Sequence, residues 1–280
     1  MSRRDVVLAS SRETRQPAIK PINIGIAGAG RMGRAIIAAI DGRDDFHLSG
    51  IWVRDEQAAA ALHVAAAVQV SADLDRAVDA ADVIIDFSVA AATSQVVATA
   101  VRQQKPLVCG VSGLGDEQIA RIDAASAVIP VVYDRNMSQG IAILERLVRQ
   151  AATTLGMEFE VEIDETHHVH KKDAPSGTAL KLGAAVAEAR DQTFAAVRWY
   201  APEAKTSRPA AGDIRFGVER RGEVRGVHKV SFVSATERLT FSHSVTSRQV
   251  FAVGALRAAA WISTRAPGRF DMGDVLFDKT

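Results

Sequence analysis

Between Ile22 and Asp134, two spacings of hydrophobic residues alternate along the chain. Short apolar runs rich in β-branched residues predict strands, and apolar residues three or four positions apart predict helices. The predicted strands are INIGIA (22–27), HLSGIWV (47–53), VIIDF (83–87), LVCGV (107–111) and VIPVVYD (128–134). The predicted helices span 34–40, 91–104, 116–125 and a segment capped by Ser71 that runs to about Ala80. Strands that alternate with helices indicate a parallel sheet covered on both faces, an α/β fold.

After Asn136 the pattern changes. A long helix is predicted from Ser138 to about Leu155, and residues 159–168 (FEVEIDETHH) alternate like a half-exposed strand. Ser176 is the predicted N-cap of an amphipathic helix over 176–190. Residues 213–247 alternate with period two and predict an antiparallel meander. The predicted last helix begins at Gln249 and ends at about Ser263, and the apolar VLF (275–277) after it is expected to return to the first lobe.

Length and composition narrow the classes of function. A chain of 280 residues is near the size at which one hydrophobic core gives way to two, so two lobes are expected. Lys plus Arg (34) nearly balance Asp plus Glu (33), which argues against recruitment of nucleic acid or an anionic membrane by charge. No apolar segment approaches the roughly 20 residues of a membrane span, and we expect a cytoplasmic protein. The one cysteine, Cys109, excludes an internal disulfide and is expected to be buried in a strand.

The segment Gly28-Ala29-Gly30-Arg31-Met32-Gly33 matches G-x-G-x-x-G between a predicted strand and a predicted helix. In that context the glycines let the backbone approach a pyrophosphate, and free N–H groups at the helix start stabilise its charge. An ordinary tight turn is the alternative. Because the motif lies between a predicted strand and a predicted helix, we predict a bound dinucleotide in contact with Gly28, Gly30, Arg31, Met32 and Gly33.

The end of the second predicted strand bears on which nicotinamide cofactor is used. An acidic side chain there accepts hydrogen bonds from a ribose diol, whereas a cation suits a 2′-phosphate. If the strand ends at Val53, Arg54 is the first charged side chain beyond it, which favours NADPH. An alignment shifted by two residues uses Asp55 instead and favours NADH, and Arg54 is then a solvated surface residue.

The segment THHVHKKDAPSGTAL (166–180) holds three histidines, two lysines and an aspartate in eight residues before a helix start. A zinc site is disfavoured, because His168 and His170 alternate away from His167 on a strand and no further ligands accompany them. Histidines in a loop without function are a second interpretation. We favour proton chemistry beside an anion site, in which Lys171 and Ser176-Gly177-Thr178 hold carboxylates next to a polarisable C=N or C=C bond.

The block ETHHVHKKDAPSGTAL (165–180) closely resembles the signature of the 4-hydroxy-tetrahydrodipicolinate reductase (dihydrodipicolinate reductase) family. The resemblance covers nearly everything from Ile22 onward. It includes, in order, GIAGAGRMGRAI (25–36), IIDFS (84–88), CGVSG (109–113), RNMSQGIAIL (135–144) and FDMGDVL (270–276).

This resemblance implies a Rossmann-like dinucleotide-binding domain at 21–135 and 249–280, and a central α+β domain at 136–248 that binds substrate and builds a homotetramer. Residues 1–20 are expected to be a flexible tail. The implied reaction is hydride transfer from NADH or NADPH to a cyclic imine dicarboxylate in the diaminopimelate route to lysine. By position, His167 is the implied acid, Lys171 a proton-donating and substrate-activating lysine, and His168 a substrate contact, while Gly177 and Thr178 grip a carboxylate. Implied cofactor contacts are Arg54, Asp86, Phe87, Ser88, Gly110, Val111, Ser112, Gly113, Arg135, Asn136 and Met137.

The chain departs from the family pattern at several of these positions. Many relatives carry Thr-Thr where this chain has Val111-Ser112, Phe in place of Met137, and a small residue or Pro in place of Arg135. Two other functions compete: a two-lobed dehydrogenase acting on another amino or imino acid, and a non-enzymatic dinucleotide-sensing regulator. A sensor needs no acid beside an anion site, so the intact block of proton donors favours an enzyme.

Overall fold

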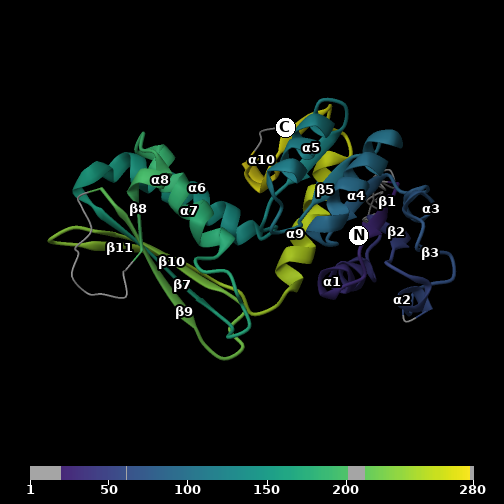
Figure 1. Ribbon diagram of the computed structural model, residues 1–280, viewed down its shortest axis with the longest axis horizontal. Coiled ribbons are helices and arrows are strands. Elements are labelled where there is room, and N and C mark those ends of the chain that lie inside the picture. The colour runs from purple at the N-terminus through teal and green to yellow at the C-terminus, as the bar shows by residue number, and fades with distance from the viewer. Residues whose placement is uncertain (1–19, 61, 201–211, 278–280) are drawn as a thin grey trace, which may run out of the picture.

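The computed structural model describes residues 20–60, 62–200 and 212–277, so the prediction of a flexible tail falls almost wholly outside the described residues. Within them the chain forms two lobes, each built around one β-sheet (Figure 1). Two connections join the lobes: one lies before helix α6 (Gln139–Leu155), and the other precedes helix α9 (Gln249–Ile262).

The first lobe is a seven-stranded sheet in the order β12-β6-β5-β4-β1-β2-β3, and every neighbouring pair is parallel. This confirms the parallel sheet expected from alternating strands and helices. Its strands are β1 (Ile22–Ala27), β2 (Phe46–Trp52), β3 (Gln69–Ser71), β4 (Val83–Asp86), β5 (Leu107–Cys109), β6 (Pro130–Tyr133) and β12 (Gly268–Phe270). Its helices are α1 (Arg31–Ile40), α2 (Glu56–Ala60), α3 (Leu74–Val78), α4 (Ala90–Arg102), α5 (Asp116–Ser126), α9 and α10 (Met272–Phe277).

Both faces of this sheet are covered, as predicted. Successive strand residues point to opposite faces. Ile85 accordingly joins the core beneath α1, α9 and α10, and Ile84 the core beneath α3, α4 and α5. Cys109 is fully buried in β5, which confirms its expected place.

One predicted helix start in this lobe is wrong. Ser71 is the last residue of β3, a strand too short for its pattern to be recognised, and α3 begins three residues later. The N-cap is Asp73, whose carboxylate accepts a hydrogen bond from the Arg76 N–H at 3.3 Å. The sequence offers a serine and an aspartate two residues apart, and the pairing of β3 with β2 decides between them.

The second lobe is a five-stranded mixed sheet in the order β11-β10-β7-β9-β8. The predicted antiparallel meander is wrong here. Only β10 and β11 form an antiparallel hairpin, whereas β7 lies between β9 and β10, parallel to the first and antiparallel to the second. Alternation predicts strands and their faces but not their partners. The strands are β7 (Glu160–His167), β8 (Arg198–Tyr200), β9 (Ile214–Arg220), β10 (Val227–Val233) and β11 (Arg238–Ser244).

The described helices of this lobe cover one face of the sheet, and none of them covers the other (Figure 1). Helices α6 and α7 (Gly177–Ala189) bury an apolar core against β7, β9 and β10, with the short α8 (Phe194–Val197) beside them. Ser138 and Ser176 cap α6 and α7, as predicted; each hydroxyl accepts an N–H three residues later, at 3.4 and 3.2 Å. The opposite face is polar, and Glu162 there pairs with Arg215 and Arg238 at 2.7 Å each.

The C-terminal segment returns to the first lobe, which confirms that expectation. Helix α9 packs against α1, and β12 then adds to the edge of the parallel sheet beside β6. Across the described ranges, every helix is too short or too polar to cross a bilayer.

Candidate active site

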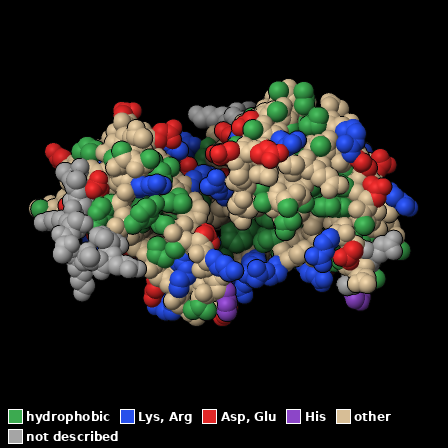
Figure 2. Space-filling view, viewed as in Figure 1, with side chains coloured by type: hydrophobic (Ala, Val, Ile, Leu, Met, Phe, Trp, Pro, Cys, Tyr) green, Lys and Arg blue, Asp and Glu red, His purple; other side chains and the backbone are tan. Residues whose placement is uncertain are grey.

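The two lobes enclose a cleft of about 1000 Å³. Figure 2 shows the hollow between them, with Lys and Arg side chains along its rim. Residues far apart in the sequence meet here: the glycine-rich turn, the ends of β4, β5 and β6, and the histidine and lysine block. The cleft gathers these predicted site residues: Gly30, Arg31, Met32, Phe87, Ser88, Gly110, Val111, Ser112, Gly113, Arg135, Asn136, Met137, His167, His168, Lys171, Ser176, Gly177 and Thr178.

Gly28 and Gly33 shape the turn from behind the cleft rather than lining it. Gly28 has φ of +99°, and a Cβ there would approach the Ser88 Cα to 2.8 Å. A Cβ on Gly33 would stand 2.0 Å from the Gly28 carbonyl oxygen. Both glycines are therefore required for the turn to fold tightly against β4 and α1.

The start of α1 fits a pyrophosphate. Its N-cap is Gly30, which offers no side chain to accept the first N–H groups of the helix. A Cβ at Gly30 would meet nothing within 4 Å, so open space lies over those N–H groups. Free donors and the positive end of the helix dipole beside a cleft are the features that bind a phosphate.

The floor of the cofactor side is built by loops after β4 and β5. The Phe87 ring packs so closely on Gly110 that a Cβ there would lie 2.2 Å from it. Asp86 is buried and does not line the cleft; its Oδ1 accepts the Ser88 N–H at 2.9 Å. Burial raises the pKa of Asp86 to about 6, against opposing hydrogen bonds from Ser88 and Thr93. Asp86 therefore positions the loop of Phe87 and Ser88 from below.

Arg54 lies outside the cleft lining, two residues beyond the end of β2. Its side chain is 92% exposed, and its Nε lies 3.2 Å from Asp55 Oδ2. Asp55 is already engaged, because its Oδ1 accepts the Ala58 N–H in the first turn of α2 at 2.8 Å. That hydrogen bond, together with Arg54, lowers the pKa of Asp55. One oxygen of the Asp55 carboxylate caps α2, and the exposed Arg54 guanidinium contacts the other.

The histidine and lysine block occupies the end of β7 and the turn into α7. His167 is buried in the cleft wall, and Lys171 lies nearby with its Nζ 2.9 Å from Asp173 Oδ1. His170 is outside the cleft; its side chain is 73% exposed and pairs with Glu223 at 3.3 Å. His168 and His170 have their ring centroids 5.9 Å apart, whereas His167 is buried beside Glu165 and His228, so the three histidines of the block do not converge on one point.

Several residues in this wall were not singled out from the sequence: Glu165, Arg220, His228 and His243. Glu165 is buried on β7, directly opposite His228 on β10. Its Oε1 accepts the Ser176 N–H at 3.0 Å and pairs with Arg220 Nη2 at 3.1 Å. One signal was available for Glu165, because it shares the buried face of the strand with Ile163 and Val161, two and four residues earlier.

Three histidines beside the cleft, His167, His228 and His243, have pKa values below the usual range. Burial lowers the pKa of His167, with Lys171 and Arg220 acting in the same direction and Glu165 opposing them. Burial also lowers the pKa of His228, to about 3, and that of His243. Ligand atoms of Glu165, His167 and His228 lie within 4.8 Å of one another, but the cations Arg220 and Lys171 next to them favour a hydrogen-bonding network over a metal site.

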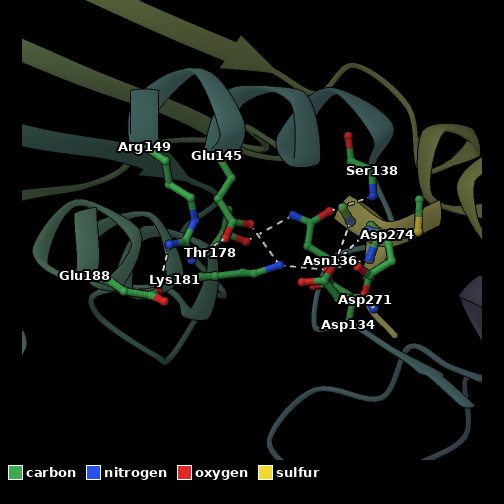
Figure 3. Close-up of polar contacts among 12 residues, drawn as sticks. Asp134, Asn136, Ser138, Glu145, Arg149, Thr178, Lys181, Glu188, Asp271 and Asp274 are labelled. Carbon is green, nitrogen blue, oxygen red and sulfur yellow. Dashed lines mark hydrogen bonds and ion pairs between the residues drawn. The ribbon is translucent and has the colours of Figure 1, made fainter. Parts of the chain in front are cut away.

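Direct hydrogen bonds and ion pairs connect the end of β6 to the second lobe (Figure 3). The Asn136 amide donates to Thr178 Oγ1 at 3.0 Å, which ties the loop after β6 to the start of α7. Three residues along the helix, Lys181 Nζ lies 2.8 Å from Asp134 Oδ2 and 3.0 Å from Glu145 Oε2. These contacts therefore join the predicted cofactor loop to the predicted carboxylate-binding helix start.

Comparisons with known proteins agree with this geometry. The family model "Dihydrodipicolinate reductase, N-terminus" matches residues 22–137, and the model "Dihydrodipicolinate reductase, C-terminus" matches residues 140–276. A protein from Caulobacter vibrioides named 4-hydroxy-tetrahydrodipicolinate reductase is 42% identical over 260 residues, covering 92% of this chain and 98% of its own length. A protein of the same name from Zymomonas mobilis is 40% identical over 256 residues, covering 91% and 97%.

Solved structures share the fold. A dihydrodipicolinate reductase from Paenisporosarcina sp. TG-14, described as dipicolinate-bound, superposes with a TM-score of 0.73 at 20% identity, covering 92% of this chain and 99% of its own. The DAP dehydrogenase of C. glutamicum, in complex with DAP, superposes with a TM-score of 0.56 at 14% identity, covering 94% and 97%. At these identities the likeness concerns the arrangement of the two lobes.

Proposed function

The chain belongs to the dihydrodipicolinate reductase family, and from this we propose that it is an NAD(P)H-dependent reductase of 4-hydroxy-tetrahydrodipicolinate in the diaminopimelate route to lysine. One observation carries the proposal. The glycine-rich turn (28–33) and the block holding His167 and Lys171 (165–180) are far apart in sequence, yet both contribute residues to one cleft. Reduction needs a hydride donor and a proton donor on one substrate, and this cleft has room for both.

The cofactor would bind along the first lobe. The start of α1 at Gly30 supports a pyrophosphate, and the loops at Phe87-Ser88 and Gly110–Gly113 would lie along the rest of the molecule. When bound, the reduced nicotinamide supplies the hydride. We propose NADPH as the preferred form, because Asp55 caps α2 whereas Arg54 is exposed and can pair with a 2′-phosphate.

The substrate would bind at the start of α7. The N–H groups of Gly177 and Thr178 open this helix and, with the dipole, suit one carboxylate. His168 and Lys171 line the same part of the cleft. Arg135 also reaches this point, since its Cδ lies 3.8 Å from the position of a Cβ on Gly177. Arg135, which was predicted to contact the cofactor, would therefore also place a positive charge beside a bound dicarboxylate.

The proton would come from His167 or Lys171. Loss of the 4-hydroxyl as water leaves a conjugated imine, and hydride addition at C4 gives an enamine that must accept a proton. Lys171 can donate while it is charged, a form that a bound dicarboxylate favours. His167 can donate once an arriving anion offsets the positive charge of Lys171 and Arg220 near it.

The lobe limits and the assembly form part of the proposal. We assign residues 21–135 and 249–280 to the cofactor domain and 136–248 to the substrate domain. We also infer a homotetramer, supported by the face of the five-stranded sheet that none of the described helices covers.

The test is reduction of enzymatically generated hydroxy-tetrahydrodipicolinate, followed by the absorbance of NADPH and NADH. We expect the wild type to oxidise the cofactor only when this substrate is present. H167Q and K171A should lower kcat by about 10²–10⁴-fold, the contribution typical of a general acid, without weakening NADPH binding.

Matched controls come from the same loop. H170Q and K172A change an exposed imidazole and an exposed ammonium outside the cleft, and both should keep wild-type rates. Binding of NADPH without turnover would instead favour the sensor, and near-normal rates in H167Q and K171A would remove both residues from the reaction.

A further inference from the structure

A buried carboxylate stands directly behind the candidate acid. The Glu165 side chain has no solvent exposure, and its Oε2 lies 3.4 Å from His167 Nδ1. Within the described parts of the chain, neither of these buried atoms makes a hydrogen bond. Glu165 Oε2 also lies 3.7 Å from His228 Nε2, but that nitrogen is closer to Ser176 Oγ, at 3.3 Å. Because a buried polar atom is costly to leave unpaired, we place a proton of the His167 imidazole on Nδ1, facing Oε2.

The other half of the carboxylate is fully engaged. Arg220, from the end of β9, and the Ser176 N–H, at the cap of α7, both donate to Oε1. A charge removed from water is stable only when it is paired and hydrogen-bonded, and these two donors meet that condition for an ionised Glu165. The same carboxylate thereby fixes the start of α7, where the substrate carboxylate would bind, relative to His167.

The orientation of His167 leaves its second nitrogen free for chemistry. With Nδ1 toward Glu165, Nε2 lies against Gly226, where an added Cβ would come within 3.1 Å of it. Gly226 has φ of +155°, and with His167 it lines the cleft. A proton on Nδ1 held by Glu165 thus leaves Nε2 as the atom that exchanges the reacting proton.

The charges around His167 are otherwise unfavourable for an acid. Lys171 and Arg220 disfavour its protonated form, and the exposed Asp173 and buried Glu165 favour it. His228 packs edge-on at 5.0 Å between ring centroids and is neutral, so it adds no charge. Glu165 is the only one of these groups that is both anionic and buried, and low exposure strengthens its effect.

We propose that Glu165 is a positioning residue for the reaction: it holds His167 through Nδ1, stabilises the imidazolium that donates from Nε2, and anchors the helix start that grips the substrate. This inference rests on the proposed function. In the step itself, Nε2–H gives its proton to the enamine left by hydride addition, and His167 returns to the neutral form with its other proton still on Nδ1, facing the Glu165 carboxylate. Solvent then restores the proton on Nε2.

The test compares E165Q with E162Q in the same steady-state assay across pH. Glu162 lies on the same strand and, like Glu165, is paired with arginine; its two arginine partners are on the polar face of the sheet. E165Q removes the negative charge and keeps the shape. Because an opposite charge within about 4–6 Å shifts a pKa by about 1–3 units, the basic limb of kcat/KM should move down by about 1–3 pH units. The direction follows because a donor must be protonated, so activity falls as pH rises through its pKa. E162Q should keep the wild-type limb.

A second measurement does not depend on whether E165Q folds. In the wild type, 15N NMR of histidine should show neutral His167 as the tautomer with its proton on Nδ1. The opposite tautomer, or an unmoved basic limb in a folded E165Q that binds NADPH normally, would overturn the inference. Failure of the wild type to reduce hydroxy-tetrahydrodipicolinate would instead overturn the proposed function, so the two failures can be told apart.

Discussion

Replacing Asp134 with Asn tests whether the lobes are tied together through the end of β6 (Figure 3). The Asp134 carboxylate is 3% exposed; it pairs with Lys181 at 2.8 Å, accepts the Asn136 N–H at 3.1 Å and lies 3.4 Å from the Met272 N–H. The pair raises the pKa of Lys181 despite its burial, with Glu145 contributing at 3.0 Å. D134N keeps one oxygen, for the Asn136 N–H, and replaces the oxygen that faces Lys181 and the Met272 N–H with a neutral amide.

The expected loss follows from what remains around Lys181. Removing one partner of a buried ion pair costs about 3–5 kcal/mol when the other charge is left alone. Here Glu145 stays in place and the Lys181 side chain is 26% exposed, so we expect about 2 kcal/mol. For a chain of this size that corresponds to a fall in Tm of about 4–8 °C. Because the pKa of Lys181 is raised in the folded chain, its contribution is fully present below 10.5 and is lost only as pH rises beyond it.

The assay is thermal unfolding followed by circular dichroism at about pH 7, with a double-mutant cycle through K181M. The charge of Lys181 is already absent in K181M, so adding D134N should cost much less there. E117Q is the control, since it breaks the exposed Arg121–Glu117 pair at 3.0 Å and should cost about 0.5 kcal/mol or less. A D134N protein that melts within about 1 °C of the wild type would refute the reasoning.

Two further predictions concern the cofactor side. R54A should raise KM for NADPH by about 10-fold and leave KM for NADH unchanged, because it removes one charged hydrogen bond available only to a 2′-phosphate. Equal effects of R54A on the two KM values in steady-state kinetics would contradict this. D86N should raise Tm at about pH 8 and have no effect near pH 4. Burial raises the pKa of Asp86 from 3.8 to about 6, so above pH 6 the wild type ionises this carboxyl in the folded chain at a cost of up to about 3 kcal/mol. A lower Tm for D86N at about pH 8 would contradict that assignment.

The sequence predicted helices and strands better than it predicted which strands pair with one another. Caps at Ser138 and Ser176 were predictable, because a hydroxyl just before an apolar period satisfies local N–H groups and needs no distant partner. The place of β7 between β9 and β10 was not predictable from alternation, because any of these strands can present an apolar face to α6 and α7. Strand pairing is decided by the whole sheet at once.

The candidate site likewise contains residues that the sequence predicted and residues that only strand pairing brings together. His167 and Lys171 stand in one block whose spacing signals chemistry, and the structure brings that block to the cleft. His228 and Arg220 are separate residues in an alternating region, and only the pairing of β9 and β10 with β7 brings them to Glu165. Glu165 itself lies inside the recognised block, but its importance depends on contacts contributed by both neighbouring strands and by the cap of α7.

The net charge of the whole chain is close to zero, but the cleft is strongly cationic. Its charged lining comprises one carboxylate, Asp173, and five cations: Arg31, Arg135, Lys171, Arg225 and Arg248. Asp173 already pairs with Lys171, and within the described ranges no ion pair or hydrogen bond reaches the four arginine side chains. Burial lowers the pKa of Arg248, and Arg31 and Arg225 lower it further while Glu223 opposes them, so like charges lie near one another beside the cleft. Such charges repel until an anion lies between them. Because the proposed cofactor and substrate are both anions, we expect each to draw the lobes together, so that water is excluded only when hydride and proton donors are both in place.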